Sequence, residues 1–278
     1  AITTGQYNTA VGHDALTSVA GADNNVGIGL SAGAAITSGA GNTACGTNSG
    51  YFVSTGSNNT FLGFQAGQGI TGTRLTGADN TTVGKDAGLL LQGAAESNTL
   101  IGALAGDALT TGSLNTAVGK TALGSDTQGS RAVAIGRFAL GTQNFTSATA
   151  NYNVAIGYSA GGSITDGVQN VCIGGTAGDA VNSGSQNTIM GYDAGTNVST
   201  GEHNTLIGKE AGTVIAAGDY NVIIGADSDT DHQNAQSRLV LGFGVENPTD
   251  NSVRIGSGGN FISNTFTSNA TWAHSSDE

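Results

Sequence analysis

The chain repeats one short pattern of polar and apolar positions along most of its length. Each unit reads N-[TV]-x-[VIL]-G-x-x-A-[GL], as in NTAVGHDAL at 8–16 and NTAVGKTAL at 115–123. We number the Asn as position one, so that Val, Ile or Leu stands at position four and Gly at position five. Small and β-branched residues followed by Gly predict a short β-strand that ends in a tight turn.

The residues that open the units define the period of the repeat. Ten of the thirteen intervals between them are 17 residues, and the others are 18, 21 and 21. Ala132 replaces Asn in one unit, and a weaker unit opens at Arg238. The other units open at Asn8, Asn25, Asn42, Asn59, Asn80, Asn98, Asn115, Asn153, Asn170, Asn187, Asn204 and Asn221. A fixed period over this length indicates a repeat architecture.

The period favours one fold class, an all-β parallel β-solenoid, or β-roll, of about fourteen coils. Helical-hairpin repeats need about 33 residues or more, which is nearly twice this period. Rows of Ala and Gly further predict a thin coil whose interior does not hold Leu and Phe. We expect stacking to align the position-four side chains in one apolar column: Val11, Ile28, Leu62, Val83, Ile101 and Val118.

A thin solenoid is marginally stable as a monomer, because stability rises with buried area. We therefore expect a homo-oligomer, and specifically a trimer. The repeats predict a solenoid domain over 1–244 and a separate C-terminal segment over 245–278.

The composition excludes several classes of protein. Glycine contributes 47 residues, proline one, and charged residues only 10%, against about 25% in an average protein. The net charge is −12 and the eight Lys and Arg residues are scattered, so we expect no nucleic-acid partner. No apolar run approaches the roughly 18 residues of a membrane span, so we expect no membrane insertion.

The repeated Asn has a structural and a functional interpretation. Stacked Asn side chains can hydrogen-bond along a column or cap the turn that they open, and the alternative is a ladder of ligand-binding groups. A Thr row at position two also suggests an ice-binding face, formed by Thr9, Thr43, Thr60, Thr81, Thr99, Thr116, Thr188 and Thr205. Val replaces Thr in several units, and we expect the row to flank the inward side of the strand, which argues against ice binding.

The chemically versatile residues do not form a recognisable catalytic or metal site. Cys45 and Cys172 lie seven coils apart, roughly 34 Å at the spacing of stacked strands, so we expect two buried free thiols and no disulfide. The DSDTD stretch offers Asp227, Asp229 and Asp231 as weak Ca²⁺ or Mg²⁺ ligands, but it lacks the Gly and Glu of an EF-hand loop.

The His residues at 13, 203, 232 and 274 show no metal-binding spacing. The sequence also lacks a Ser/His/Asp set and the recurrent carboxylate pair that a carbohydrate-cleaving tailspike would need. We therefore expect no cofactor and no enzymatic activity.

Two units contain four extra residues each, in QGITGTRLTGAD (68–79) and GTQNFTSATANY (141–152). Insertions in repeats often mark a binding face, although tolerated decoration is the alternative. Arg74, Phe145 and Tyr152, which are uncommon residue types in this chain, are the candidates for contact with a receptor.

The repeat resembles those of two families of trimeric surface fibre. VAIG at 133–136 and 154–157 resembles the left-handed parallel β-roll heads of trimeric autotransporter adhesins, and NTxxGxxAG resembles repeats in bacteriophage tail fibres. The resemblance implies an extracellular homotrimer that binds a glycan or protein receptor on a host cell. A virion tail fibre is the first expectation, and the head of a bacterial surface adhesin is the alternative.

The last stretch, NSVRIGSGGNFISNTFTSNATWAHSSDE, is similar to the junction before the C-terminal intramolecular chaperone of phage tail fibres and endosialidases. The resemblance implies that Ser276 starts the chaperone and is the nucleophile of self-cleavage, with a Lys as its base. That Lys would follow Glu278. The resemblance thus implies a fibre whose folding helper has been removed or left out, and such a helper would fix the register of near-identical coils.

Overall fold

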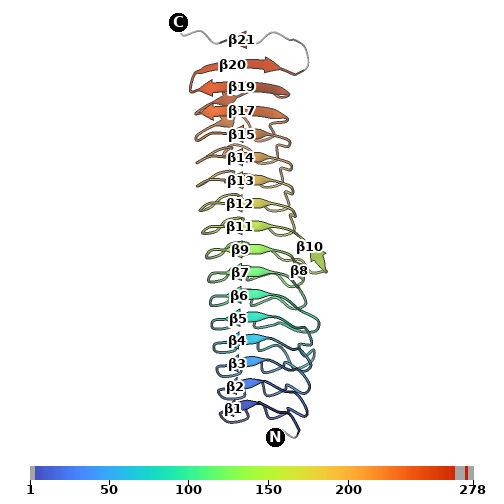
Figure 1. Ribbon diagram of the computed structural model, residues 1–278. Helices are drawn as coiled ribbons and strands as arrows, with labels where there is room; N and C mark the ends of the chain where they lie inside the picture. The colour runs from blue at the N-terminus through green and yellow to red at the C-terminus, as the bar shows by residue number, and fades with distance from the viewer. Residues whose placement is uncertain (1–3, 267–272, 275–278) are drawn as a thin grey trace. The chain divides into compact units, whose positions relative to one another are not determined.

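The computed structural model describes residues 4–266 and 273–274. The chain divides into two compact units, Ala1–Asn151 and Tyr152–Glu278. Every regular element among the described residues is a β-strand, and each unit is a parallel β-solenoid (Figure 1). The fold class predicted from the 17-residue period is therefore confirmed.

The first unit stacks eight three-residue strands, one from each coil, with equivalent repeat positions side by side. A shorter parallel pair, β8 with β10, joins the two coils near the second insertion. The strands are β1 (Thr9–Val11), β2 (Val26–Ile28), β3 (Thr43–Cys45), β4 (Thr60–Leu62), β5 (Thr81–Val83), β6 (Thr99–Ile101), β7 (Thr116–Val118), β8 (Gly129–Ser130), β9 (Val133–Ile135) and β10 (Thr149–Ala150).

The second unit stacks seven coils in the same way and ends in antiparallel strands. Its coil strands are β11 (Val154–Ile156), β12 (Val171–Ile173), β13 (Thr188–Met190), β14 (Thr205–Ile207), β15 (Val222–Ile224), β17 (Arg238–Phe243) and β19 (Ser252–Ser257). The others are β16 (Asp229–Thr230), β18 (Glu246–Asn247), β20 (Asn260–Thr265) and β21 (Ala273–His274). Parallel stacking thus continues beyond residue 244, and the pairing becomes antiparallel only at β20.

The alternation of side chains along each strand places position three inside the coil and position four outside it. In β4, Phe61 is fully buried, whereas Leu62 is 47% exposed. The apolar column expected from position four does form, because Val11 pairs with Ile28 and Ile28 with Cys45. It lies on the outer face, so it is not the core of the solenoid.

The interior holds large apolar side chains, so the expectation of a thin interior without Leu or Phe is wrong. Position three contributes residues such as Phe61 and Leu100, both fully buried. A second buried column comes from the variable stretch, eleven residues after the opening residue in most of the repeats. It contains Val19, Ile36, Val53, Leu91 and Leu109 in the first unit, and Ile164, Val181, Val198 and Ile215 in the second.

Positions three and nine compensate each other in volume inside the first unit. Where position nine is Leu, position three of the same coil is Ala, as in Leu123 and Ala117. Where position three is Phe61, position nine is Gly67, and a Cβ built on Gly67 would lie 2.1 Å from the Phe61 ring. The choice between Gly and Leu at position nine therefore preserves close packing of the core.

The Gly at position five is required by the stacking of successive coils. Gly46 has φ 136°, and a Cβ there would lie 2.3 Å from the carbonyl oxygen of Gly63 in the next coil. No other residue tolerates both that backbone conformation and that approach.

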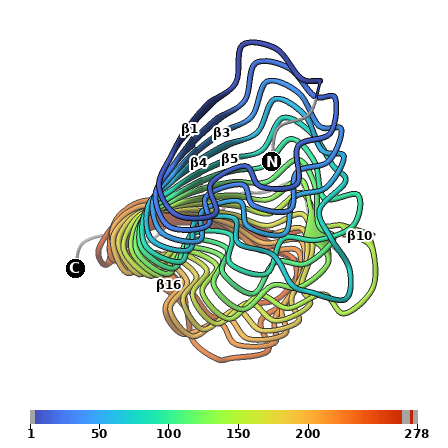
Figure 2. The ribbon, with the colours of Figure 1, turned by 90° about the horizontal axis from the view of Figure 1, so that it is seen from below.

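The turns of each coil also place non-glycine residues in the left-handed backbone conformation. Leu104 and Phe138, both at position seven, have φ of 59° and 61°. Such a conformation costs roughly 1 kcal/mol or more for a residue with a Cβ. Hydrogen bonds between coils offset this cost, as when Leu104 N donates to the carbonyl of Lys85. Figure 2 shows β1, β3, β4 and β5 together on one side of the first unit, with β10 at another corner.

Candidate functional site

The Asn side chains at position one form a buried ladder. Asn98 Oδ1 accepts hydrogen bonds from Asn115 N at 3.1 Å and Asn115 Nδ2 at 3.2 Å. Asn98 Nδ2 donates to the carbonyl of Gly112 at 3.0 Å. Because the side chain is fully buried and its polar atoms bond to adjacent coils, this geometry is that of a structural column and leaves no surface for a ligand.

A buried polar pair accompanies the unit in which Ala132 replaces Asn. Asp126 and Gln143 occupy the second buried column in two successive coils, and Gln143 Nε2 donates to Asp126 Oδ2 at 2.6 Å. Asp126 Oδ1 accepts from the backbone N of Gly129 at 2.9 Å and of Phe145 at 3.1 Å. Burial raises the pKa of Asp126, and these hydrogen bonds oppose the rise.

Arg238 replaces Asn at the last repeat and ends the ladder with a buried guanidinium. Its backbone N donates to Asn221 Oδ1 at 3.1 Å. Its side chain is 1% exposed and pairs with Asp231 and Asp250, each at 2.7 Å. Its hydrogen bond to Asp231 is the main cause that lowers the pKa of that carboxyl group.

The three aspartates proposed as cation ligands bind different partners. Asp229 accepts from Thr213 Oγ1 at 2.8 Å and from Val214 N at 2.9 Å, and Asp231 pairs with Arg238. Asp227 lies at position seven of its coil with a left-handed backbone. Within residues 4–266 and 273–274, no three His, Cys, Asp or Glu side chains come together as a metal site.

The two cysteines are free thiols that lie on opposite sides of their strands. Cys172 is at position three and fully buried, and burial raises its pKa to about 12. Cys45 is at position four, half-buried on the outer face, so the expectation that both are buried is wrong for Cys45.

The remaining candidates have separate surroundings. His13 contacts Asp14, His203 stacks on Tyr220 with ring centroids 4.8 Å apart, and His232 lies beside Arg238. His274 belongs to β21. Ser276, the self-cleavage nucleophile implied by the resemblance, lies outside the described residues.

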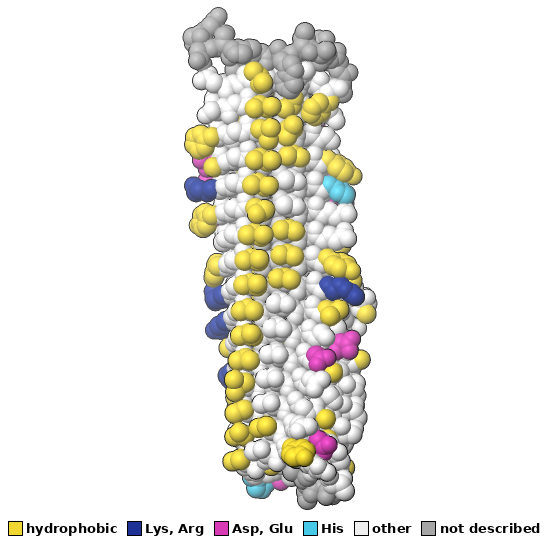
Figure 3. Space-filling model, in the orientation of Figure 1, with side chains coloured by type: hydrophobic (Ala, Val, Ile, Leu, Met, Phe, Trp, Pro, Cys, Tyr) yellow, Lys and Arg dark blue, Asp and Glu magenta, His cyan; other side chains and the backbone are white. Residues whose placement is uncertain are grey.

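The outer face of the strands in each unit carries a stripe of exposed apolar side chains (Figure 3). We call this surface the strand face and define it by positions two and four of the repeat. Its most exposed large members are Val11, Ile28, Leu62, Ile101 and Ile135 in the first unit, and Ile156, Met190 and Ile224 in the second. A monomeric protein seldom leaves so long an apolar row in contact with water.

The two edges of the strand face differ in charge in the first unit. Four of the eight basic residues stand at position six, directly after the strand: Lys85, Lys120 and Arg137 in the first unit, and Lys209 in the second. At position seven, Asp86 pairs with Lys85, and Asp14 follows His13. The second unit has Asp193, Glu210 and Asp227 at this position. The edge before the strands of the first unit has one base, Arg131, and three acids, Asp23, Asp79 and Glu96.

The Thr row lies on the same outer face. Thr43 pairs with Thr60 and Thr60 with Thr81, so the hydroxyl-bearing side chains repeat in register along the first unit. Their placement corrects the expectation that this row flanks the inward side.

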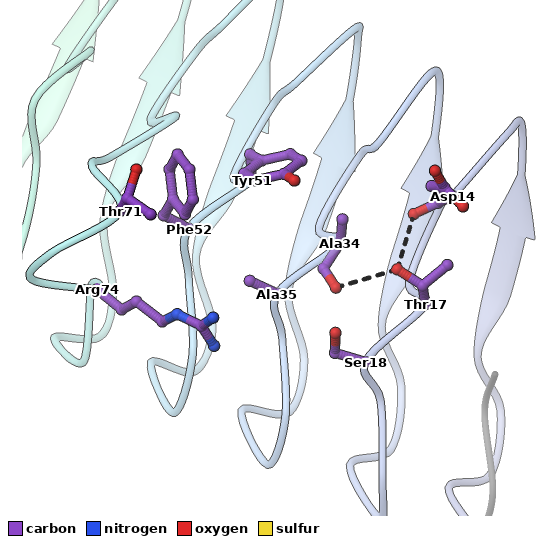
Figure 4. A pocket seen from close by; sticks show the side chains of 9 residues that line it. All are labelled: Asp14, Thr17, Ser18, Ala34, Ala35, Tyr51, Phe52, Thr71 and Arg74. Atoms are coloured by element: carbon purple, nitrogen blue, oxygen red, sulfur yellow. Dashed lines mark hydrogen bonds between the residues drawn. The ribbon is translucent and has the colours of Figure 1, made fainter.

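A groove of about 430 Å³ lies on another corner of the first unit (Figure 4). Three successive coils line it with the residues at positions ten and eleven, which are Thr17–Ser18, Ala34–Ala35 and Tyr51–Phe52. Asp14 lies at one end, and the insertion of the fourth coil supplies Thr71 and Arg74. The groove exists because the middle coil has only Ala at this corner, whereas the next coil has two aromatic rings.

The structure separates the three residues proposed for receptor contact. Arg74 is exposed and lines the groove. Phe145 is 7% exposed and packs in the interior, so its assignment as a surface contact is wrong. Tyr152 belongs to the second unit, directly before Asn153, and is 52% exposed. Only 5% of the residues are aromatic, so the adjacent pair Tyr51 and Phe52 could have marked this part of the sequence as a candidate site.

Comparison with models of known protein families found no match, and comparison with curated proteins found none either. Among the described residues, no helix is long and apolar enough to cross a membrane.

Proposed function

We propose that this chain is a non-enzymatic structural protein of an extracellular fibre, specifically a bacteriophage tail fibre. In the proposed assembly, three parallel copies pack along their strand faces and present their outer corners to the host cell. The strand face is the single observation that supports the assembly most strongly. The number three and the phage origin rest on the resemblance of the repeat and of the C-terminal stretch to trimeric fibres.

The area of the strand face supports association. Eight stacked strands about 10 Å long and about 4.8 Å apart present roughly 400 Å² in the first unit, and the second unit adds a similar amount. Stable interfaces bury about 800 Å² on each partner. The strand face of each unit therefore supplies about half of that area.

The charged edges support a parallel arrangement. When parallel copies pack face to face, the edge after the strands of one copy meets the edge before the strands of its neighbour. With equal coils level, Lys85 of one copy then lies beside Asp79 of its neighbour, an opposite charge, although Arg137 lies beside Arg131. An antiparallel pair related by a twofold axis would instead place like edges together.

The solution mass tests the proposed assembly. We expect sedimentation equilibrium to give three times the chain mass across a wide range of dilution. A stable monomer would overturn the fibre assembly, and a stable dimer would overturn the number of copies. To test the attachment role, the labelled trimer is incubated with candidate host cells, and failure to bind any of them would count against that role.

Ice binding is a second candidate function because the Thr row faces outward in register. Ordered hydroxyl and methyl groups on a flat face are the feature that favours it. Val26 and Val133 interrupt the row, and the larger position-four side chains stand beside it. A measurement of thermal hysteresis decides this point: a freezing gap that Thr60→Tyr abolishes would support ice binding, and no gap would exclude it.

A further inference from the structure

We propose that the groove at Tyr51, Phe52 and Arg74 binds a saccharide that bears a carboxylate. This inference rests on the proposed function, because it names the ligand class for attachment to a cell surface. The groove is at a different corner of the coil from the strand face, at positions ten and eleven. Association through the strand face therefore leaves it open.

Arg74 supplies the charge for this site. Among the described residues, no ion pair and no hydrogen bond engages its guanidinium group. Figure 4 shows its side chain extending from the insertion toward Ala35 and Ser18. A guanidinium binds a carboxylate through two parallel hydrogen bonds, which gives orientation as well as affinity. In a chain with a net charge of −12, an unpaired cation in a groove is an uncommon feature.

The aromatic residues supply an apolar wall. The Tyr51 and Phe52 rings meet edge to face with centroids 4.4 Å apart, and both side chains are half-exposed. Ala34 and Ala35, which are 7% and 6% exposed, form a flat floor beside them. A pyranose ring has apolar C–H faces that pack on such rings, while its rim of hydroxyl groups stays hydrated.

The opposite end of the groove supplies groups that suit sugar hydroxyls. Thr17 and Ser18 present hydroxyl groups, and the Asp14 carboxylate, 54% exposed, accepts hydrogen bonds. Thr17 Oγ1 has two backbone acceptors, the carbonyls of Asp14 and Ala34, each at 3.3 Å.

These surroundings favour a monoanionic sugar over a more highly charged ligand. One Arg faces Asp14 across the groove, so a phosphate or a polyanion would meet too little positive charge. A neutral sugar would leave the guanidinium without its partner.

Ligand titration followed by NMR tests this site with two probes, 3′-sialyllactose and trigalacturonic acid. Neutral lactose and sodium acetate are the controls for the ligand. The protein variants are Arg74→Gln and Tyr51→Ala, and Lys120→Gln is the matched control for loss of an exposed charge. Circular dichroism verifies that each variant retains the fold.

We expect at least one acidic probe to bind at least about tenfold more tightly than lactose and acetate. Arg74→Gln and Tyr51→Ala should each weaken binding about tenfold, and Lys120→Gln should leave it unchanged. Three results would overturn the proposal: no binding of either acidic probe, equal binding of lactose or acetate, or unchanged binding to Arg74→Gln. A trimer that binds neither probe refutes only this site, whereas a monomer that binds one refutes only the fibre assembly.

Discussion

Two neighbouring residues of β4 show how differently the two faces of one strand are used. Phe61 points into the coil, where Gly50 and Gly67 leave room for its ring. Leu62 points out and is 47% exposed, in a row of similar side chains. The inner face varies in size from coil to coil and is compensated by its neighbours, whereas position four of the outer face is apolar in every coil. The inner face thus stabilises one chain, and the outer face is suited to binding another.

Phe61→Ala should have the largest effect on the stability of the chain. Removing a fully buried ring between two glycines leaves a cavity, so we expect a loss of about 3 to 5 kcal/mol in the free energy of unfolding. Leu62→Ala, the matched outer variant, should cost less than about 1 kcal/mol at protein concentrations where copies dissociate. Denaturant unfolding measures both. Equal losses would contradict the distinction between the two faces.

Asn98→Ala should be the next most destabilising change. It leaves the buried N–H of Asn115 and the carbonyl of Gly112 without these partners. We expect a loss of about 2 to 4 kcal/mol, because each unpaired buried polar group is costly. Thr99→Val, on the outer face of the same coil, should change the unfolding midpoint little. A neutral Asn98→Ala variant would show that the ladder does not stabilise the solenoid.

Asp126 tests the polar pair in the interior column. Because its pKa is raised in the folded protein, the folded state holds this proton more tightly than the unfolded chain does. Its contribution to stability is therefore greatest at acid pH and is lost as pH rises from the unfolded pKa through the folded one.

We expect Asp126→Asn to reduce this pH dependence while keeping an acceptor for Gly129 N. Asp126→Ala, which removes the acceptor, should cost about 1 to 3 kcal/mol. Unfolding curves between pH 3 and pH 7 supply the measurement. If the stability of Asp126→Asn follows the wild-type pH profile, Asp126 is not the cause of the pH dependence.

Ile101→Asp should weaken association without unfolding the chain. It places a charge on the strand face, where a partner would have to bury it. We expect at least about a tenfold loss in the association constant, measured by sedimentation. Thr111→Asp, at an exposed turn, is the control and should associate as the wild type does. Full association of Ile101→Asp would show that the strand face is not the interface.

Much of the fold follows from the sequence, and the reasons are local. The 17-residue period and the Gly at position five predict stacked coils, since only Gly permits the close approach seen at Gly46. Which strand positions point inward could not be predicted from the sequence. In a three-residue strand, position three lies between Thr and Val, so the alternation gives no clear polar side. The second buried column was hidden in the variable stretch, where residues such as Ile36 recur singly among dissimilar neighbours.

The candidate groove was less predictable than the fold. Arg74 stood out as an uncommon residue in an insertion, but Thr17 and Tyr51, which line the same groove, belong to other coils. Each lies 17 residues or more from Arg74 in the sequence. Only stacking brings them together. Phe145 illustrates the opposite case, because its insertion buries the ring while its backbone N–H donates to the buried Asp126.

Native Cys45 offers the most direct test of parallel association, because it lies on the strand face, whereas Cys172 is buried. The intact protein is treated with a short bis-maleimide crosslinker, and the linked peptides are identified by mass spectrometry. Parallel copies in register place Cys45 of one chain near Cys45 of the next, so we predict a covalent dimer linked Cys45 to Cys45 that Cys45→Ser abolishes and Cys172→Ser preserves. Crosslinker that adds to Cys45 but joins no two chains would contradict the assembly.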